Sequence, residues 1–199
     1  MGSLSVSRIK RELKEIMRRD EIIQGLIKIE VLDDNFMELR GEISGPEDTP
    51  YEGGKFSLDI KVPVGYPFNP PTVRFTTRIW HPNVCYMTGS ICNDILMNNW
   101  AAAMTIPSVL LSLQGLMSVP EPDEPQNIVV GFQYKEEHDM FLITAKHWTN
   151  VYAGGPFHFP ECDTKIQHLV NMGVDENEAR IILSKRSWDM QNTTEHLFT

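Results

Sequence analysis

A cysteine, an asparagine and an aspartate lie close together in one polar stretch of this 199-residue chain. The stretch runs through His81-Pro82-Asn83-Val84 and on to Thr88-Gly89-Ser90-Ile91-Cys92-Asn93-Asp94. Because Cys92 follows a Thr-Gly turn and has polar neighbours, we expect its thiol at a bend rather than within a strand. An exposed thiol is strongly nucleophilic even when only about a few per cent of it is thiolate. A thiol beside a hydrogen-bond donor such as Asn83 is suited to carrying an acyl group as a thioester.

Transfer of such an acyl group to a lysine amine sets a further demand. At an ordinary pKa of about 10.4, only about one lysine in 2,500 is neutral at about pH 7. An acidic side chain from the proline-rich loop of residues 120–125, Asp123 or Glu124, could orient or desolvate the incoming amine. The Asn83 carboxamide could stabilise the oxyanion, which is worth roughly 10²–10³ in rate. It could equally satisfy backbone groups of a loop, and both roles stay open.

Other uses of these residues are weaker interpretations. A cysteine is most often a small buried hydrophobic residue, the alternative that applies to Cys85 and Cys162. A metal centre is not expected, because the cysteines show no Cys-x-x-Cys spacing and no second ligand pair follows. A papain-like protease would need a partner histidine, and His138 and His147 fall on helices that we predict to lie at the surface.

The elements that must position this stretch are readable from hydrophobic periodicity. Apolar residues at helical spacing predict an amphipathic helix from residue 5 to about residue 19. Alternating patterns then predict strands around residues 27–31, 37–43, 56–62 and 73–75. Their short connections require an antiparallel meander, and its apolar face must be covered by a helix.

Two loops and three helices complete this first part of the chain. Four prolines in Pro63-Val64-Gly65-Tyr66-Pro67-Phe68-Asn69-Pro70-Pro71 predict a rigid, extended loop. It can hold Phe68 in place even if exposed, although Tyr66 and Phe68 could both pack beneath it. A helix capped by Thr105 follows the cysteine stretch. A short helix marked by Ile128, Val129 and Phe132 and a longer one on the stripe Phe141, Ala145, Trp148 and Tyr152 come next.

The chain is expected to divide into two units. The first is an α+β domain over residues 1–153, consisting of a helix, the four-stranded antiparallel meander and C-terminal helices. Residues 154–160 contain two glycines and two prolines and are interpreted as a linker. Residues 161–199 show three short helical patterns, the second begun by a capping-box-like pairing of Asp175 with Glu178. A bundle this small must use most of its apolar side chains as core.

Composition narrows the classes of function. The net charge of −9 argues against general nucleic-acid binding, and no apolar run approaches the ~20 residues of a membrane helix. Three cysteines, an odd number, favour a reducing compartment, so cytoplasm or nucleus is expected. The first 20 residues carry a net +3 against −12 for the remainder. That basic segment is either an ordinary solvated helix face or a contact for an acidic partner.

In order and spacing, several of these motifs resemble those of ubiquitin-conjugating enzymes. The resemblance covers residues 5–153 and rests on the basic first helix, Tyr66-Pro67-Phe68-Asn69-Pro70-Pro71, Trp80-His81-Pro82-Asn83, Gly89-Ser90-Ile91-Cys92, Trp100 and Pro122-Asp123-Glu124-Pro125. Residues 161–199 resemble a ubiquitin-associated (UBA) domain, mainly through Met172-Gly173 and Leu197-Phe198. The combination is similar to family members that carry a C-terminal UBA domain and build polyubiquitin chains.

The resemblance implies a ubiquitin-conjugating fold followed by a three-helix UBA-like bundle, and an enzyme that takes ubiquitin from the activating enzyme and transfers it to lysine. It implies no cofactor, because the activating enzyme uses the ATP. The implied partners are ubiquitin, the activating enzyme and ubiquitin ligases. The implied roles are catalysis by Cys92, Asn83, Asp94 and Glu124; activating-enzyme contact by Arg8, Arg11 and Lys14; ligase contact by Phe68, Ala102 and Ala103; and ubiquitin contact by Met172, Gly173, Val174 and Leu197.

Some residues depart from the family pattern. Asn93 replaces a leucine directly after the cysteine, and Glu124 replaces an aspartate. Val174 and His196 replace an aromatic residue and a leucine on the UBA surface, which bears on its affinity for ubiquitin. Two other functions remain as alternatives, a non-catalytic ubiquitin-binding adaptor and a conjugating enzyme for another ubiquitin-like modifier. Retention of Cys92 and Asn83 argues against the adaptor.

Overall fold

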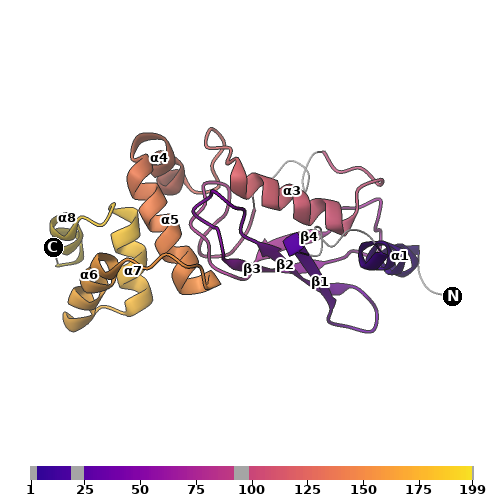
Figure 1. Cartoon of the computed structure of the whole chain (residues 1–199), viewed down its shortest axis with the longest axis horizontal. Coiled ribbons are helices and arrows are strands. Elements are labelled where there is room, and N and C mark those ends of the chain that lie inside the picture. The colour runs from indigo at the N-terminus through magenta and orange to yellow at the C-terminus, as the bar shows by residue number, and fades with distance from the viewer. Residues whose placement is uncertain (1–3, 19–24, 92–98, 199) are drawn as a thin grey trace.

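In a computed structural model, residues 4–18, 25–91 and 99–198 are described, and the other residues lie outside the description. The chain is elongated, with the N-terminal helix at one end and a bundle of three helices at the other (Figure 1). The elements in chain order are α1 (Leu4–Arg18), β1 (Ile27–Val31), β2 (Glu38–Ser44), β3 (Lys55–Lys61), β4 (Thr72–Phe75), α3 (Ile106–Ser118), α4 (Ile128–Glu136), α5 (His138–Ala153), α6 (Pro160–Asn171), α7 (Glu176–Lys185) and α8 (Met190–Phe198). None of the helices within the described ranges is both long and apolar enough to cross a membrane.

The four strands form the expected antiparallel meander, in the order β1-β2-β3-β4. Ile43 pairs with Ile27 on one side and with Phe56 on the other, and Leu58 pairs with Phe75. Every second residue of β3 is buried, because successive side chains of a strand point to opposite faces. The alternation in the sequence therefore set both the register and the buried face.

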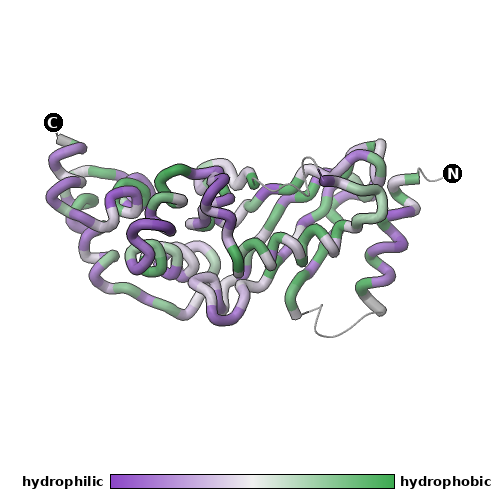
Figure 2. The backbone as a smooth tube through the Cα atoms, turned by 90° about the horizontal axis from the view of Figure 1, so that it is seen from above, coloured by the Kyte–Doolittle hydropathy of each residue, from purple (hydrophilic) through white to green (hydrophobic). Residues whose placement is uncertain are grey.

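Helix α3 covers the buried face of the sheet. Its N-cap Thr105 accepts a hydrogen bond from the Ser108 amide, and the Ser108 side chain accepts one from the Thr105 amide in return. The helix approaches β2 so closely that a Cβ at Gly41 would lie 3.2 Å from Leu110. Apolar residues run along much of α3, whereas α1 is largely hydrophilic (Figure 2). The main core therefore lies between α3 and the sheet.

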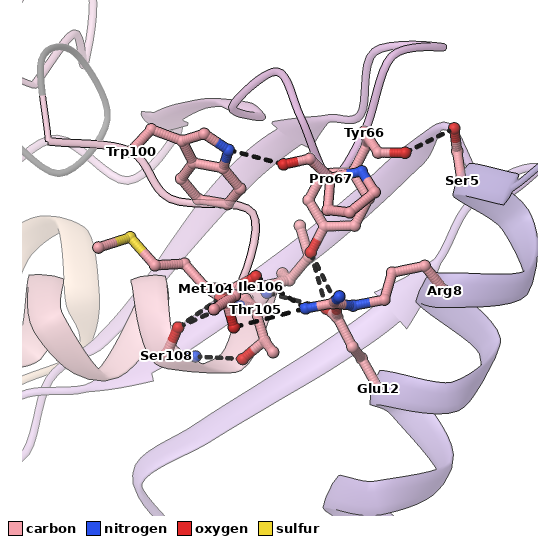
Figure 3. A network of polar contacts seen from close by, with 11 residues as sticks. Ser5, Arg8, Glu12, Tyr66, Pro67, Trp100, Met104, Thr105, Ile106 and Ser108 are labelled. Atoms are coloured by element: carbon pink, nitrogen blue, oxygen red, sulfur yellow. Dashed lines mark hydrogen bonds and ion pairs between the residues drawn. The ribbon is translucent and has the colours of Figure 1, made fainter.

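Helix α1 is fixed at one end of the domain by a buried carboxylate, that of Glu12 (Figure 3). The Tyr66 hydroxyl donates to both of its oxygens, at 2.7 and 2.9 Å, and the Ile106 amide at the start of α3 donates at 3.0 Å. Arg8 binds the carboxylate from one turn away, with Nε at 2.6 Å from Oε1. Burial and the hydrogen bond to Glu12 raise the pKa of Tyr66 above its usual range. One side chain thus joins α1, the proline-rich loop and α3.

The C-terminal bundle, which consists of α6, α7 and α8, has its own core and docks on α4 and α5. Helix α5 ends at Ala153 and α6 begins at Pro160, on either side of the predicted linker. The bundle core is centred on Leu169, Leu183 and Trp188, and side chains from α5 pack against it. The contact is also polar, because the Trp188 indole donates to the Thr144 hydroxyl of α5 at 2.9 Å.

The structure corrects one expectation about the helices, the surface position of His147, and adds the buried face of α4, which the sequence left open. Ile128 and Phe132, which mark α4 in the sequence, are 80% and 57% exposed, and α4 instead buries Val130 and Gln133. His147 does not lie at the surface, because the docked bundle covers it and Trp188 packs edge-on against its ring. The bundle therefore covers the face of α5 that carries His147, whereas Val130 of α4 packs into the main core.

Replacing Glu12 by alanine should destabilise the protein strongly. The substitution leaves the buried Tyr66 hydroxyl and the Arg8 guanidinium without their shared acceptor, a loss of about 3 kcal/mol in the free energy of unfolding. Urea unfolding of Glu12→Ala measures it, and Glu15→Ala, an exposed position on the same helix, is the matched control. Equal unfolding midpoints for the two variants would contradict the anchoring role.

Candidate active site

The polar segment of residues 80–83, here called the site segment, crosses the interior without regular secondary structure. Its His81 is fully buried, and the ring makes a hydrogen bond through each nitrogen. Nδ1 accepts from the Asn83 amide at 3.0 Å, and Nε2 lies 3.1 Å from the carbonyl oxygen of Leu116 in α3. A carbonyl can only accept, so the proton is on Nε2 and the imidazole is neutral. Burial lowers the pKa of His81 to about 4, and the bond to Leu116 only partly opposes that shift.

The Asn83 carboxamide ties the site segment to the acidic loop, residues 120–125. Its Nδ2 donates to the carbonyl oxygen of Glu121 at 2.8 Å and to that of Glu124 at 3.3 Å. Its Oδ1 accepts from the Glu121 amide at 2.9 Å. Both amide protons are therefore used inside the protein. The role of satisfying loop backbone groups is present in the structure, and a bond to an oxyanion would require one proton to leave its carbonyl.

A short turn brings the chain from the site segment to the residue before Cys92. Val84 forms bridges with His81 and with Ile91, and Ser90 forms one with Arg74 of β4. Gly89 has φ +72°, and a Cβ there would lie 1.8 Å from the carbonyl oxygen of Phe75, so only glycine fits. The backbone is thereby fixed up to Ile91. Cys92 and Asp94 lie outside the described residues.

The acidic loop carries exposed carboxylates, including those of Asp123 and Glu124. Glu124 is exposed, while its backbone carbonyl is held by Asn83. The Asp123 side chain is 90% exposed and pairs with Lys135 of α4 at 2.5 Å. The structure therefore brings Asn83 and the backbone of Glu124 together, and it leaves the Glu124 carboxylate free to face solvent.

The two other cysteines differ in chemistry. Burial by itself raises the pKa of the Cys85 thiol, but hydrogen bonds from Thr88, Met87 and Ser90 outweigh it and lower the pKa below its usual value. Cys162 is buried in the bundle core, and burial raises its pKa to about 12. Cys162 is therefore an inert core residue, whereas Cys85 is a second reactive thiol that any test of Cys92 must control for.

The residues predicted to contact the activating enzyme and the ligase gather at the α1 end of the domain. A single hollow there is lined by Leu4, Ser7, Arg8, Arg11, Pro67, Phe68 and Ala102. Phe68 is 70% exposed, whereas Tyr66 is buried, so only Tyr66 packs beneath the proline-rich loop. Ala103 contributes its backbone, because its carbonyl accepts from Arg8 at 3.5 Å. Arg8 is thus occupied within the protein, while Arg11 and Lys14 are exposed.

The predicted ubiquitin-binding residues lie in the turn after α6 and in α8. Met172 is exposed, and Gly173 has φ +96°, which closes the turn after α6. Val174 and Leu197 are half-buried against the bundle core. The bundle meets α4 and α5 through hydrogen bonds to Ser184 and Ser187, and Met172 is 44% exposed.

Gln133 was not predicted as a site residue. It is 2% exposed and bonds both the Trp80 indole of the site segment and the bundle. In the sequence, Gln133 is marked only by its spacing, since it lies three positions after the apolar Val130. That spacing identifies a helix face but not the partner that covers it.

Comparisons with known proteins agree on one family. Residues 8–149 match the model of the family described as "Ubiquitin-conjugating enzyme". The chain is 63% identical to "Ubiquitin-conjugating enzyme E2-22 kDa" of Drosophila melanogaster and 53% identical to human "Ubiquitin-conjugating enzyme E2 K", each over 100% of both chains. The solved E2 domain of a Toxoplasma gondii ubiquitin conjugating enzyme superposes with a TM-score of 0.66 at 44% identity, covering 72% of this chain and 98% of that one.

The protein should lose stability as the pH falls below neutrality. The folded state keeps His81 and His147 neutral down to about pH 4, whereas unfolded histidine binds a proton near its ordinary pKa of about 6.5. Unfolding therefore takes up protons between these values, and each histidine costs about 2 kcal/mol between about pH 7 and about pH 5. Urea unfolding at the two pH values measures the loss. His81→Asn should be less stable at about pH 7 but should show a flatter pH dependence, and an unchanged slope would contradict the assignment.

Proposed function

The chain belongs to the family of ubiquitin-conjugating enzymes, and on that premise we propose that Cys92 is the residue that carries ubiquitin. The Cys92 thiolate attacks the thioester carbonyl that links ubiquitin to the activating enzyme, and the activating enzyme's thiol leaves. A neutral lysine amine then attacks the new thioester. A C–N bond forms, the C–S bond breaks, and the nitrogen loses a proton. The supporting observation is the hydrogen-bonded frame of Asn83, the acidic loop and the Val84–Ile91 bridge, which ends one residue before Cys92.

Asn83 supports the second step in two proposed ways. Its hydrogen bonds hold the acidic loop in place, which positions Glu124 for the incoming amine. Its longer bond, to the Glu124 carbonyl, is the one that an oxyanion could replace. Asp94, two residues after Cys92 in the sequence, completes the proposed catalytic set.

Two surfaces are proposed for the protein partners. Arg11 and Lys14, with Arg8 behind them, are proposed to meet the activating enzyme, and Phe68, Ala102 and Ala103 to meet ligases. The rigid presentation of Phe68 supports this assignment, because the Trp100 indole donates to the Pro67 carbonyl at 2.8 Å and stiffens the loop.

The C-terminal bundle is proposed to bind ubiquitin through Met172, Gly173, Val174 and Leu197. A docked bundle that also holds ubiquitin would keep a growing chain near Cys92, which supports polyubiquitin chain building. The proposed location is the cytoplasm, and also the nucleus. Its support is that Cys85 and Cys162 are both free thiols.

Incubation with ubiquitin, activating enzyme and ATP should give a ubiquitin adduct that a thiol reductant removes. The adduct should be lost in Cys92→Ala and retained in Cys85→Ala, because Cys92 matches the thioester-forming cysteine of the family. Cys85 instead lies within the turn of the frame, where its amide donates to the Ser90 carbonyl at 2.9 Å. Gel electrophoresis with and without reductant measures it. Loss of the adduct in Cys85→Ala alone would move the nucleophile to Cys85. An adduct formed only with another ubiquitin-like modifier would contradict the choice of ubiquitin.

Asn83→Ala should separate the two steps. Loading of Cys92 should stay within a few-fold of the unmodified protein, whereas discharge of ubiquitin to free lysine should fall roughly 10²–10³-fold. Single-turnover discharge after quenching of the activating enzyme measures the second step. Asn35→Ala, an exposed position in the turn between β1 and β2, is the control. Equal losses in loading and discharge would show a general structural role instead.

A further inference from the structure

Gln133 makes three hydrogen bonds that connect the site segment to the C-terminal bundle. Its Oε1 accepts from the Trp80 indole at 2.8 Å. Its Nε2 donates to the carbonyl oxygen of Ser184 at 3.0 Å and to the Ser187 hydroxyl at 3.1 Å. The side chain therefore accepts a hydrogen bond from the catalytic domain and donates both of its amide protons to the bundle.

The orientation of this carboxamide is determined by its partners. An indole nitrogen can only donate, and a backbone carbonyl can only accept. Oε1 must therefore face Trp80, and Nε2 must face Ser184. Without the bundle, nothing in the described chain would hold Nε2 away from the indole. A rotated amide would then place a donor against a donor.

The same serine of the bundle holds a second indole. The Ser184 hydroxyl accepts from the Trp148 indole at 2.9 Å, and the Trp148 ring lies 5.0 Å from that of Trp80. Trp80 is fully buried, so its N–H has no water to replace a lost acceptor. The bundle thus governs the surroundings of Trp80 through Gln133 and through Trp148.

Trp80 directly precedes His81-Pro82-Asn83, and α4 holds this segment at a second point. The amide of Asn127, the N-cap of α4, donates to the carbonyl oxygen of Pro82 at 3.1 Å. Helix α4 also follows the acidic loop that Asn83 binds. A displacement of α4 or of Trp80 would therefore move Asn83 itself and also the acidic loop that Asn83 binds.

We propose that Gln133 is a positioning residue through which the docked bundle sets the geometry of Asn83 and the acidic loop for ubiquitin transfer. The proposal rests on the proposed function, because it assumes that Asn83 serves the discharge step. It gives the bundle a role in catalysis that does not require the bundle to bind ubiquitin.

The test uses the full chain, loaded with ubiquitin and discharged to free lysine in a single turnover. Gln133→Leu should lower the maximal discharge rate about fivefold, the equivalent of one hydrogen bond of about 1 kcal/mol. The lysine concentration at half-maximal rate and the rate of loading should stay within about twofold, because Gln133 is only 2% exposed and is not accessible to either reactant. Glu136→Gln, an exposed position on α4, is the matched control.

A second variant, Gln133→Glu, tests the orientation argument. The carboxylate that it introduces keeps an acceptor for Trp80 but can donate to Ser184 only when it is protonated. The discharge rate of this variant relative to the unmodified protein should therefore rise as the pH is lowered from about 8 to about 6. Circular dichroism at both pH values is the control, because a buried carboxylate also destabilises the fold more when it is ionised. A rise in rate that only follows a rise in the folded fraction would reject the orientation argument.

The outcomes separate the two proposals. Failure of the unmodified protein to form the Cys92 adduct would overturn the proposed function and this inference with it. Normal loading together with an unchanged discharge rate in Gln133→Leu would overturn the positioning role alone. If Gln133→Leu does not fold, Ser187→Ala removes one of the two acceptors and should lower discharge about twofold. An unchanged rate there would likewise reject the inference.

Discussion

The site segment lies in the interior without forming a helix or a strand, and this constraint organises much of the molecule. Regular elements satisfy their own backbone groups, but an irregular buried segment must find partners elsewhere. The Trp80 carbonyl accepts from the Tyr51 hydroxyl at 2.9 Å, and the Pro82 carbonyl accepts from the Asn127 amide at 3.1 Å. The side chains of the segment add further bonds, from His81 to α3 and from Asn83 to the acidic loop. Within the described residues, no buried side-chain nitrogen or oxygen lacks a hydrogen-bond partner.

Each of these bonds fixes one element relative to the site segment. The Leu116 carbonyl comes from the last turn of α3, the Glu121 backbone from the loop after it, and Gln133 from α4. The site segment therefore holds α3, the acidic loop and α4, which are consecutive in the chain, against one another. An enzyme that works through a thioester benefits from such a frame, because its rate depends on where donors and carboxylates are held.

Buried polar side chains perform similar work at the two ends of the catalytic domain. Glu12 joins its own helix α1 to the proline-rich loop and to α3, and Gln133 joins the catalytic domain to the bundle at the other end. Such groups add little stability in the net balance, but they specify one arrangement, since the wrong one leaves them unsatisfied. The hollow that contains Phe68 is also lined by Arg8, which pairs with Glu12. Gln133 in turn bonds the bundle. Each of the two buried side chains therefore helps to orient a surface that is proposed to bind a partner.

Local chemistry in the sequence determined the elements and the nucleophile candidate. Alternation in Phe56, Leu58 and Ile60 predicted β3 and its buried face, Thr105 and Asp175 predicted where helices begin, and the motif around Asn83 singled out Cys92. These signals are local, because a strand period or an N-cap needs only a few neighbouring residues. The buried face of α4, the burial of His147, the internal use of Arg8 and the partners of Asn83 and Gln133 were decided by tertiary structure. Each depends on a group that is distant in the sequence, or on the docking of the bundle. The periodic pattern of neighbouring residues cannot predict such contacts, because it depends only on residues close together in the chain.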